Sequence, residues 1–294
     1  PQMTIELKLK KNAQKIDRFL LKFLKKQKKS LLIAPMKYGV ISGGKKIRST
    51  IIFDTCKMLK VDEKKLLSVC TAVECIHSYS LIHDDLPCMD NDPTRRGKPS
   101  THKKFGEATA VLAGNSLLTL AFEIISYKKN FLSPKQKNEI INLLSYCSGH
   151  TGIAGGQELD LKFENKRKKL SQIIDMQKKK TGKLFNFCIQ SVAIIANRNR
   201  RERELLGKLG EEIGFLFQLS DDFLDLKGSK KLLGKPIKKD NKKGKSTLIS
   251  LLGYKKAHKY AENLKKKILL KLKKHGKNSS NLIDTINFVK ERNF

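Results

Sequence analysis

The sequence predicts an all-α protein, and three observations support that fold class. Apolar residues recur at helical spacing through most of the chain. The first such segment, residues 4–27, carries on its apolar face Ile5, Leu9, Ile16, Leu20 and Phe23. Alternating strand patterns closed by Asn-Gly or Asp-Gly turns are absent from the sequence. Hydrophobic residues make up 39% of the chain, which is enough to build a substantial core.

The helical period divides the chain into long segments with short connections. The predicted helices are residues 4–27, 66–83, 107–126, 136–148, 171–196, 202–226 and 246–272. Glycine and proline mark the connections, which we expect at residues 39–46, 87–100, 127–135 and 228–245. There is no internal repeat and no linker long enough to divide the sequence. Residues 1–294 are therefore predicted to form one helical domain with a central bundle.

The chain is strongly basic, with a formal net charge of +34. Such a charge attracts nucleic acids and anionic membrane surfaces. Lysine, however, is spread over almost every polar segment, and Asn and Ile are also frequent, which is typical of an AT-rich coding sequence. No zinc finger, RNA-recognition signature or basic zipper is present. We therefore expect no specific nucleic-acid partner.

Membrane and export signals are also missing from the sequence. No run of about 18 apolar residues predicts a membrane span, and the first residues do not resemble a secretory signal. The cysteines are scattered and form no CxxC pair, as expected for reduced thiols in a cytoplasmic protein. They are Cys56, Cys70, Cys75, Cys88, Cys147 and Cys188.

An acidic motif follows the apolar stretch that ends near residue 83, and it contains Asp84, Asp85 and Asp90. Carboxylates at the end of a buried helix repel one another and lose hydration unless cations compensate them. Pro87 is expected to end the helix and to let Asp90 turn back toward Asp84. Such oxygen ligands suit Mg²⁺, which keeps several waters and is shared with substrate phosphates. A solvated acidic helix end is the alternative for this motif alone.

A second acidic motif lies in residues 215–225. Asp221 and Asp225 are four residues apart and so share one helix face, with Asp222 beside them and apolar residues around them. A second acidic face is unexpected by chance in a chain this basic. Two acidic clusters match the need of a diphosphate leaving group for several divalent cations.

Basic residues beside glycines form a third group. Residues 43–48 read as a loop that enters a helix, where backbone amides favour a phosphate. Arg95 and Arg96 directly follow the first acidic motif, and arginine makes bidentate contacts to phosphate. Residues 180–183, 234–235 and 244–247 complete the group. A single lysine here is more typical of solvated surface, and the glycine spacing is not that of a P-loop.

In this combination the motifs resemble those of the trans-isoprenyl diphosphate synthases. The motifs are DDxxxxD at 84–90, RRG at 95–97, FxxQxxDDxxD at 215–225, GGKxxR at 43–48, GGQxLDL ending at Leu161, Lys180-Thr181 and GKST at 244–247. They occur in order across residues 40–250. Residues 74–87 are most similar to bacterial members of the family that make farnesyl diphosphate.

The resemblance implies an all-α fold with a large central cavity, usually as a homodimer. It implies a head-to-tail condensation of isopentenyl diphosphate with dimethylallyl and geranyl diphosphate to give (2E,6E)-farnesyl diphosphate. It also implies two or three Mg²⁺ ions per active site, which bridge the allylic diphosphate to Asp84, Asp90 and Asp221, with Asp85, Asp222 and Asp225 in support.

The family pattern also distributes the diphosphate-binding residues between the two substrates. It assigns isopentenyl diphosphate to Lys45, Arg48, His77 and Arg96. It assigns the allylic substrate to Arg95, Lys180, Thr181, Gln218 and Lys235.

Product length is expected to depend on the helix that precedes Asp84. Tyr79 and Ser80 lie about one turn before it. Ser80 is small, whereas Tyr79 is bulky enough to form the floor of a chain pocket, and the resemblance makes fifteen carbons the expected length. An ordinary packed tyrosine is the alternative.

Three other functions compete with this prediction. A class I terpene cyclase would show a second metal motif of the Asn/Ser/Glu type and would lack the Lys45 and Arg48 site. A non-catalytic subunit of a heteromeric synthase would have lost an aspartate motif. A basic nucleic-acid or membrane-surface binder without catalysis would not need either motif intact.

Overall fold

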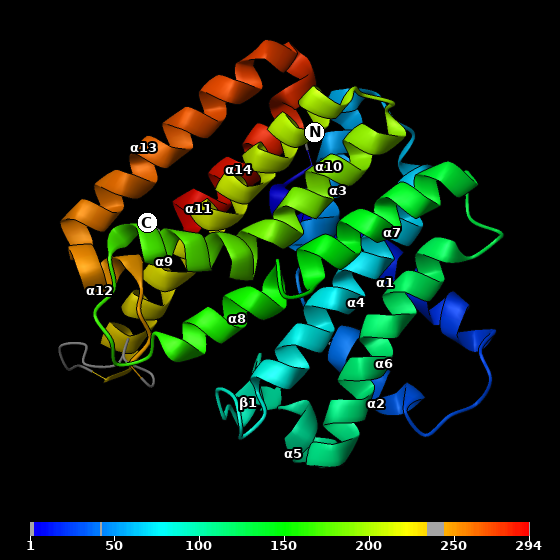
Figure 1. Cartoon of the computed structure of the whole chain (residues 1–294), viewed down its shortest axis with the longest axis horizontal. Coiled ribbons are helices and arrows are strands. Elements are labelled where there is room, and N and C mark those ends of the chain that lie inside the picture. The colour runs from blue at the N-terminus through cyan, green and yellow to red at the C-terminus, as the bar shows by residue number, and fades with distance from the viewer. Residues whose placement is uncertain (1–2, 42, 234–243, 294) are drawn as a thin grey trace. The chain divides into compact units, whose positions relative to one another are not determined.

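A computed structural model describes residues 3–41, 43–233 and 244–293 of the chain (Figure 1). The described residues are helical nearly throughout, which confirms the predicted all-α class. The helices are α1 (Ile5–Lys25), α2 (Ile33–Ile41), α3 (Ile47–Leu59), α4 (Leu67–Asp84), α5 (Thr101–Phe105), α6 (Glu107–Ser126), α7 (Pro134–Ser148), α8 (Ile153–Lys162), α9 (Leu170–Gln177), α10 (Lys183–Ile195), α11 (Arg200–Leu233), α12 (Leu248–Leu252), α13 (Tyr254–Leu272) and α14 (Ser280–Asn293).

Shorter elements join some of these helices. A π-helical turn, Lys178–Gly182, connects α9 to α10, and 3₁₀ segments cover Glu63–Leu66 and Lys273–Ser279. A two-stranded antiparallel hairpin pairs β1 (Thr94–Arg95) with β2 (Lys98–Pro99). The chain folds as two compact units. Unit 1 comprises residues 1–56 and 61–141, and unit 2 comprises residues 57–60 and 142–294.

The core of unit 1 is built around α4. Residues 68–76 of this helix are buried, so apolar surface surrounds it instead of forming one stripe. Helix α6 packs along it, and small residues allow the close approach. A Cβ added at Gly114 of α6 would lie 2.2 Å from Nε2 of His83, and one at Gly39 of α2 would lie 2.5 Å from Cδ1 of Ile82. Burying each large apolar side chain here contributes about 1.5–3 kcal/mol.

The core of unit 2 is the pair α10 and α11. Glycines of α11 let the two backbones touch, since a Cβ added at Gly210 would lie 2.5 Å from the carbonyl oxygen of Phe185. The π-turn is held in the same way by α8, because a Cβ at Gly156 would lie 2.2 Å from the backbone nitrogen of Lys180. These contacts fix the backbone that carries Lys180 and Thr181.

Helix α6 is the one helix among the described residues that is long and apolar enough to cross a membrane, by length and composition alone. It packs against α4, α5 and α2 within unit 1. Its residues Leu117, Ala121 and Ile125 are fully buried. A core helix of a globular protein has the same properties, and the absence of a membrane span stays a prediction.

Several predicted boundaries were wrong. The single helix expected over 246–272 is two, because Gly253 takes a φ of 82° between α12 and α13. Helix α11 continues to Leu233, into the expected loop 228–245, and α2 continues to Ile41, into the expected loop 39–46. Sequence periodicity missed α2, α5, α8 and α14, and of α3 only the start was expected, after the loop at residues 43–48. In α3 the reason is clear, because most residues from Ser49 to Leu59 are buried and leave no polar face.

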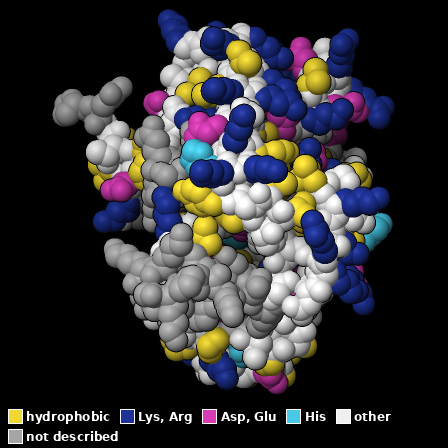
Figure 2. Space-filling model, turned by 90° about the vertical axis from the view of Figure 1, so that its left-hand side faces the viewer, with side chains coloured by type: hydrophobic (Ala, Val, Ile, Leu, Met, Phe, Trp, Pro, Cys, Tyr) yellow, Lys and Arg dark blue, Asp and Glu magenta, His cyan; other side chains and the backbone are white. Residues whose placement is uncertain are grey.

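Basic side chains are scattered over the described part of the face in Figure 2, interleaved with uncharged and apolar ones. They do not gather into one stripe that could follow a nucleic-acid backbone there. This distribution agrees with a lysine excess of compositional origin.

We therefore expect DNA to bind weakly and without regard to sequence. The dissociation constant should be about 10⁻⁴–10⁻⁶ M at physiological salt and should rise steeply with added salt, because counterion release drives the binding. Fluorescence anisotropy with two unrelated duplexes at low and physiological salt measures this. Nanomolar binding to one duplex at physiological salt would show that the charge serves a nucleic-acid partner.

Candidate active site

The first acidic motif is a helix end followed by a tight turn back. Helix α4 ends at Asp84, three residues before Pro87. The backbone N–H of Asp90 donates to the carbonyl oxygen of Asp84 at 2.8 Å, and that of Asp92 donates to the carbonyl oxygen of Asp85 at 3.1 Å. Asp90 thus turns back toward Asp84, as the sequence predicted. Both residues are half-buried, so their carboxylates combine partial shielding with access from solvent.

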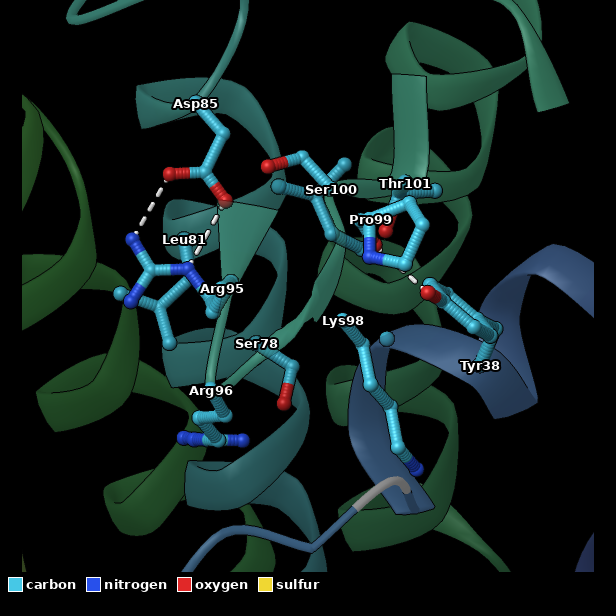
Figure 3. Close-up of a pocket in the computed structure, with 12 residues that line it drawn as sticks. Tyr38, Ser78, Leu81, Asp85, Arg95, Arg96, Lys98, Pro99, Ser100 and Thr101 are labelled. Carbon is cyan, nitrogen blue, oxygen red and sulfur yellow. Dashed lines mark hydrogen bonds and ion pairs between the residues drawn. The ribbon is translucent and has the colours of Figure 1, made fainter. Parts of the chain in front are cut away.

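The second aspartate of this motif holds an arginine (Figure 3). Asp85 is only 2% exposed and accepts hydrogen bonds from Nε and Nη2 of Arg95, both at 2.8 Å. Burial raises the pKa of Asp85, while the guanidinium of Arg95 opposes that shift. Arg95 lies on β1, and the turn after it uses positive φ at Arg96 (54°) and Gly97 (75°). Asp85 therefore orients Arg95.

A small pocket lies under this hairpin and is lined by residues of α2, α4 and α5 (Figure 3). The hydroxyl of Tyr38 on α2 donates to the carbonyl oxygen of Pro99 at 2.5 Å and fastens β2 from the other side. The pocket has a volume of about 30 Å³, which is the share of one water molecule in the liquid. It is too small to hold an isoprenoid substrate, and the hydrogen bonds of Tyr38 and Asp85 beside it hold the hairpin in place.

The glycine-rich loop lies against the second arginine of the hairpin. Gly43 has a φ of 88°, and a Cβ added at Gly44 would lie 2.7 Å from Nη1 of Arg96. Lys45 next to it is exposed, and Arg48 is half-buried in the first turn of α3. The structure thus places the loop that carries Lys45 beside Arg96. Both residues are among those expected to bind isopentenyl diphosphate.

His77 on α4 belongs to the same surroundings. Burial, together with the positive charges of Arg48 and Arg96, holds the pKa of His77 well below its usual range. A neutral imidazole offers one donor and one acceptor and no charge. The His77 ring can thus form hydrogen bonds, whereas the arginines beside it supply positive charge.

Two buried charges that were not predicted from the sequence belong to the same surroundings. Lys46 has a φ of 49°, pairs with Oδ1 of Asp17 at 2.9 Å and donates to the carbonyl oxygen of Val40 at 2.8 Å. Glu74 is 2% exposed and accepts a hydrogen bond from the hydroxyl of Ser49 at 3.0 Å. Burial raises the pKa of Glu74, opposed by Arg48 and Lys46. A lone glutamate in the apolar run 69–76 was the signal that could have found it.

The raised pKa of Glu74 predicts how stability depends on pH. Above the pKa of the unfolded carboxyl, about 4.3, the folded state binds more protons than the unfolded state. Stability is therefore lost as the pH rises through the folded pKa. Glu74→Gln removes this titration. We therefore expect the Tm of the variant, relative to that of the original chain, to rise by at least about 2 °C when the pH is raised from about 5 to about 8.

Thermal melts of both proteins at both pH values measure that difference. Glu158→Gln is the matched control, because the Glu158 side chain is 63% exposed in a surface pair with Lys162. It should shift Tm equally at both pH values. A gain for Glu74→Gln that shrinks as the pH rises would contradict the raised pKa.

Tyr79 and Ser80 occupy the turn of α4 that precedes the acidic motif. The ring of Tyr79 meets that of His83 edge-on, with centroids 5.6 Å apart, and Nε2 of His83 lies 3.0 Å from the carbonyl oxygen of Val111 on α6. The hydroxyl of Ser80 donates to the carbonyl oxygen of His77 at 2.6 Å. Tyr79 is thus a half-buried ring held by a histidine that is itself fixed to the next helix.

In unit 2 the second acidic motif is linked to the π-turn through Gln218. The hydroxyl of Thr181 donates to Oε1 of Gln218 at 3.0 Å, and Nε2 of Gln218 donates to Oδ1 of Asp222 at 3.0 Å. Burial, with the nearby carboxylates of Asp221 and Asp225, raises the pKa of Asp222 to about 8. Asp221 and Asp225 are exposed on α11. Asp222 thus orients a neighbouring side chain, as Asp85 does in unit 1.

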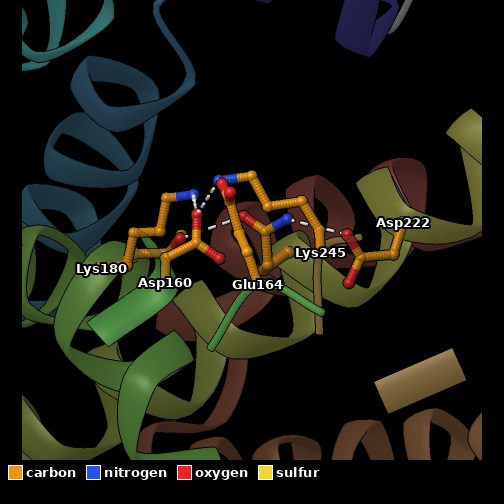
Figure 4. A network of polar contacts seen from close by, with 7 residues as sticks. Asp160, Glu164, Lys180, Asp222 and Lys245 are labelled. Carbon is orange, nitrogen blue, oxygen red and sulfur yellow. Dashed lines mark hydrogen bonds and ion pairs between the residues drawn. The ribbon is translucent and has the colours of Figure 1, made fainter. Parts of the chain in front are cut away.

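Two lysines share one buried carboxylate next to this link (Figure 4). Oδ2 of Asp160 accepts from Nζ of Lys180 at 2.7 Å and from Nζ of Lys245 at 2.8 Å, and Lys245 also pairs with Oε1 of Glu164 at 2.9 Å. Burial opposes ionisation of Asp160, yet the two lysines lower its pKa. Asp160 and Lys245 lie in motifs that were identified in the sequence, but their pairing and the contact with Glu164 were not predicted. Lys235 lies outside the described residues.

The carboxylates suit magnesium by their chemistry. Asp84 and Asp90 in unit 1, and Asp221 and Asp225 in unit 2, present oxygen ligands, and the carboxylates beside Asp222 make the acidic cluster costly without a cation. Within residues 3–41, 43–233 and 244–293, no three His, Cys, Asp or Glu side chains converge on one metal-sized position. Mg²⁺ is usually bound by one or two carboxylates together with waters and substrate phosphates, so this donor set fits it.

Helical units with aspartate motifs, each flanked by arginine or lysine, define a class of enzymes that bind diphosphates through metal ions. The chain belongs to the polyprenyl synthetase family, whose pattern matches residues 29–286. The farnesyl diphosphate synthase of Bacillus subtilis is 41% identical over 250 residues, which are 85% of this chain and 81% of that protein. That of Escherichia coli is 43% identical over 235 residues, 79% of each.

Solved structures give the same result. An FPP/GFPP synthase from Zymomonas mobilis matches with a TM-score of 0.85 at 37% identity, over 96% of this chain and 97% of that one. A geranyltranstransferase from Thermotoga maritima matches with a TM-score of 0.79 at 31% identity, over 97% of both chains. The family resemblance and the fold predicted from the sequence are both confirmed.

Proposed function

We propose that this chain condenses isopentenyl diphosphate with dimethylallyl diphosphate, and then with geranyl diphosphate, to form (2E,6E)-farnesyl diphosphate and diphosphate. The observation that carries the proposal is the similarity to farnesyl diphosphate synthases over about four fifths of the chain. The motifs for two diphosphate substrates are all present in the sequence. A terpene cyclase has no use for the second substrate site.

The metal-binding residues would be Asp84 and Asp90 in unit 1 and Asp221 in unit 2, with Asp225 beside it. We propose two or three Mg²⁺ ions per active site. Bound magnesium supplies positive charge that makes the allylic diphosphate a better leaving group. The second aspartates have a different task in this proposal, because Asp85 and Asp222 bind protein side chains.

The residues that meet the allylic diphosphate are Arg95, Lys180, Thr181 and Gln218. Asp85 holds the guanidinium of Arg95 in place by two hydrogen bonds, and Asp160 holds the ammonium of Lys180. Side chains fixed before the substrate arrives lose little freedom on binding it. Lys235 remains part of this proposed set from the sequence alone.

Lys45, Arg48, His77 and Arg96 would hold isopentenyl diphosphate. Positioning the second substrate converts an encounter into a reaction between fixed partners. The C–O bond of the allylic diphosphate breaks, a C–C bond forms from the double bond of isopentenyl diphosphate, and a proton leaves to the released diphosphate. Apolar walls around the reacting carbons keep water from the allylic cation.

The assembly and location of the protein follow from the same proposal. We propose a homodimer, as the family resemblance implies, in the cytoplasm, with no specific nucleic-acid partner and no membrane span. Size-exclusion chromatography with light scattering distinguishes a dimer of the 33.4 kDa chain from a monomer.

Product analysis tests the reaction directly. The chain is incubated with isopentenyl diphosphate, Mg²⁺ and either dimethylallyl or geranyl diphosphate, and the dephosphorylated products are separated. We expect farnesol from both starters and none without Mg²⁺. Hydrocarbons formed from an allylic diphosphate without isopentenyl diphosphate would identify a cyclase instead, and no conversion of either starter would indicate a non-catalytic subunit.

A further inference from the structure

A second pocket in unit 1 lies where α1 meets the start of α4 and the connection from α6 to α7. We call it the α1–α6 pocket. It has a volume of about 230 Å³. Half of its twelve lining residues are aromatic or aliphatic, and Phe23 and Tyr127 meet edge-on within it with centroids 5.3 Å apart. The apolar residues are Phe19, Phe23, Leu67, Ile124, Tyr127 and Phe131.

The α1–α6 pocket is well separated from the acidic motif of the same unit. Ser68 lines the pocket at the beginning of α4, and Asp84 ends that helix. The two residues are sixteen positions apart on this helix, which corresponds to about 24 Å at a rise of ~1.5 Å per residue. The pocket is therefore not part of the site built around Asp84 and Arg95.

Four lysines surround this apolar space, and all four are exposed. Among the described residues, none of them has an ion pair with a carboxylate. Other lysines of unit 1 do, such as Lys8 with Asp54 and Lys46 with Asp17. An apolar pocket with unpaired cations around it is complementary to a ligand that has an apolar chain and an anionic head. The four lysines are Lys22, Lys26, Lys64 and Lys129.

A buried hydroxyl provides an independent observation. Ser68 is 4% exposed, and its Oγ has no hydrogen-bond partner in the described structure. A buried hydroxyl without a partner is unfavourable and is usually satisfied by another polar atom. Lys64 precedes Ser68 by four residues, and both residues line the pocket. A phosphate oxygen would satisfy both.

We propose that the α1–α6 pocket binds a short-chain alkyl or prenyl phosphate. The apolar chain packs against Phe23, Tyr127 and Phe131, and the phosphate accepts hydrogen bonds from Ser68 and the surrounding lysines. A pocket volume of about 230 Å³ leaves room for a short alkyl or prenyl chain. This inference is independent of the proposed function, because it concerns a separate site.

A tryptophan reporter makes binding at this pocket visible without interference from other sites. The chain contains no tryptophan, and Phe131 is 68% exposed, so Phe131→Trp places one indole at the pocket with little effect on the core. Octyl phosphate is titrated while the emission wavelength of the indole is followed. We expect a saturable shift to shorter wavelength. Octanol has only the apolar chain and inorganic phosphate only the anionic group, so each should require at least about tenfold higher concentration to bind.

Charge variants in the reporter chain test the lysines. Lys22→Glu/Lys26→Glu should weaken octyl phosphate binding by about tenfold or more. The matched control, Lys10→Glu/Lys25→Glu, makes the same change of charge at exposed lysines of α1 that lie outside the pocket. It should change the affinity for octyl phosphate by less than about twofold. No saturable shift, or equal weakening in both variants, would overturn the proposal.

The source of the natural ligand is decided in the same assay. Geranyl diphosphate is titrated beside octyl phosphate. Saturation by geranyl diphosphate at lower concentration supports a prenyl ligand from isoprenoid metabolism, and the reverse order supports a straight-chain lipid phosphate. Either order supports the site. If neither compound shifts the emission and an unrelated hydrophobic peptide does, the pocket is a protein-docking surface instead.

Discussion

Replacing Asp84 or Asp221 by alanine is expected to remove almost all turnover while leaving the fold intact. Each change deletes one proposed ligand of the metal that compensates the leaving diphosphate. The loss of one group that stabilises charge in the transition state costs ~10²–10³ in kcat, and we expect the upper end or more for a metal ligand. Steady-state turnover with geranyl and isopentenyl diphosphate, at several Mg²⁺ concentrations, measures the effect.

Two controls separate this loss from misfolding. Asp175→Ala removes a carboxylate whose side chain is 58% exposed and pairs with Lys179, and it should keep nearly full activity. Asp84→Asn keeps the shape of the side chain and should be as inactive as Asp84→Ala. If either alanine variant kept its activity with unchanged Mg²⁺ dependence, the two-cluster mechanism would be wrong.

Replacing Tyr79 by alanine is expected to lengthen the product from fifteen to twenty or more carbons. The ring lies one turn before Asp84, and its neighbour His83 is fixed to α6 by the carbonyl oxygen of Val111. Removing the ring would open space along α4 for a longer chain. The half-buried side chain should cost about 2–3 kcal/mol of stability, below the range for fully buried aromatic residues. Chromatography of the dephosphorylated products measures chain length.

Tyr79→Phe is the matched control for this experiment. It keeps the ring and removes only the hydroxyl, so it should still stop at fifteen carbons. A folded and active Tyr79→Ala protein that also stops at fifteen carbons would place the floor of the chain pocket at other residues. Gly114 then becomes the next position to examine, because it is the residue that lets His83 approach α6.

The fold class and the motifs of the site could be predicted from the sequence because both have local signatures. Helical periodicity found α4, α6 and α11, and the bend at Pro87 correctly turned Asp90 back toward Asp84. Spacing also indicated that Asp221 and Asp225 share a helix face. The order of the motifs then specified the family, which the comparisons confirmed.

What the sequence did not show depends on contacts between distant segments. No local pattern reveals that Asp160 is shared by Lys180 and Lys245, which lies 85 residues further along the chain. Asp85 and Asp222 were expected only to support the metal ligands, because a motif does not show which side chain each aspartate contacts. Their partners Arg95 and Gln218 became visible only in the fold. The extent of helix α3 was missed because burial on nearly all sides removes the period that identifies a surface helix.

The π-turn at Lys178–Gly182 limits which insertions and deletions this part of the chain can tolerate. A π-turn is an α-helix with one additional residue, and removing that residue would restore a continuous helix from α9 through α10. The helices on either side would keep nearly their present faces, because the wider π-turn already accommodates the additional residue. Thr181, however, lies within the turn, and its hydrogen bond to Oε1 of Gln218 depends on the turn's present geometry. A one-residue deletion in this turn should therefore leave α9 and α10 helical and break the link from Thr181 to Gln218.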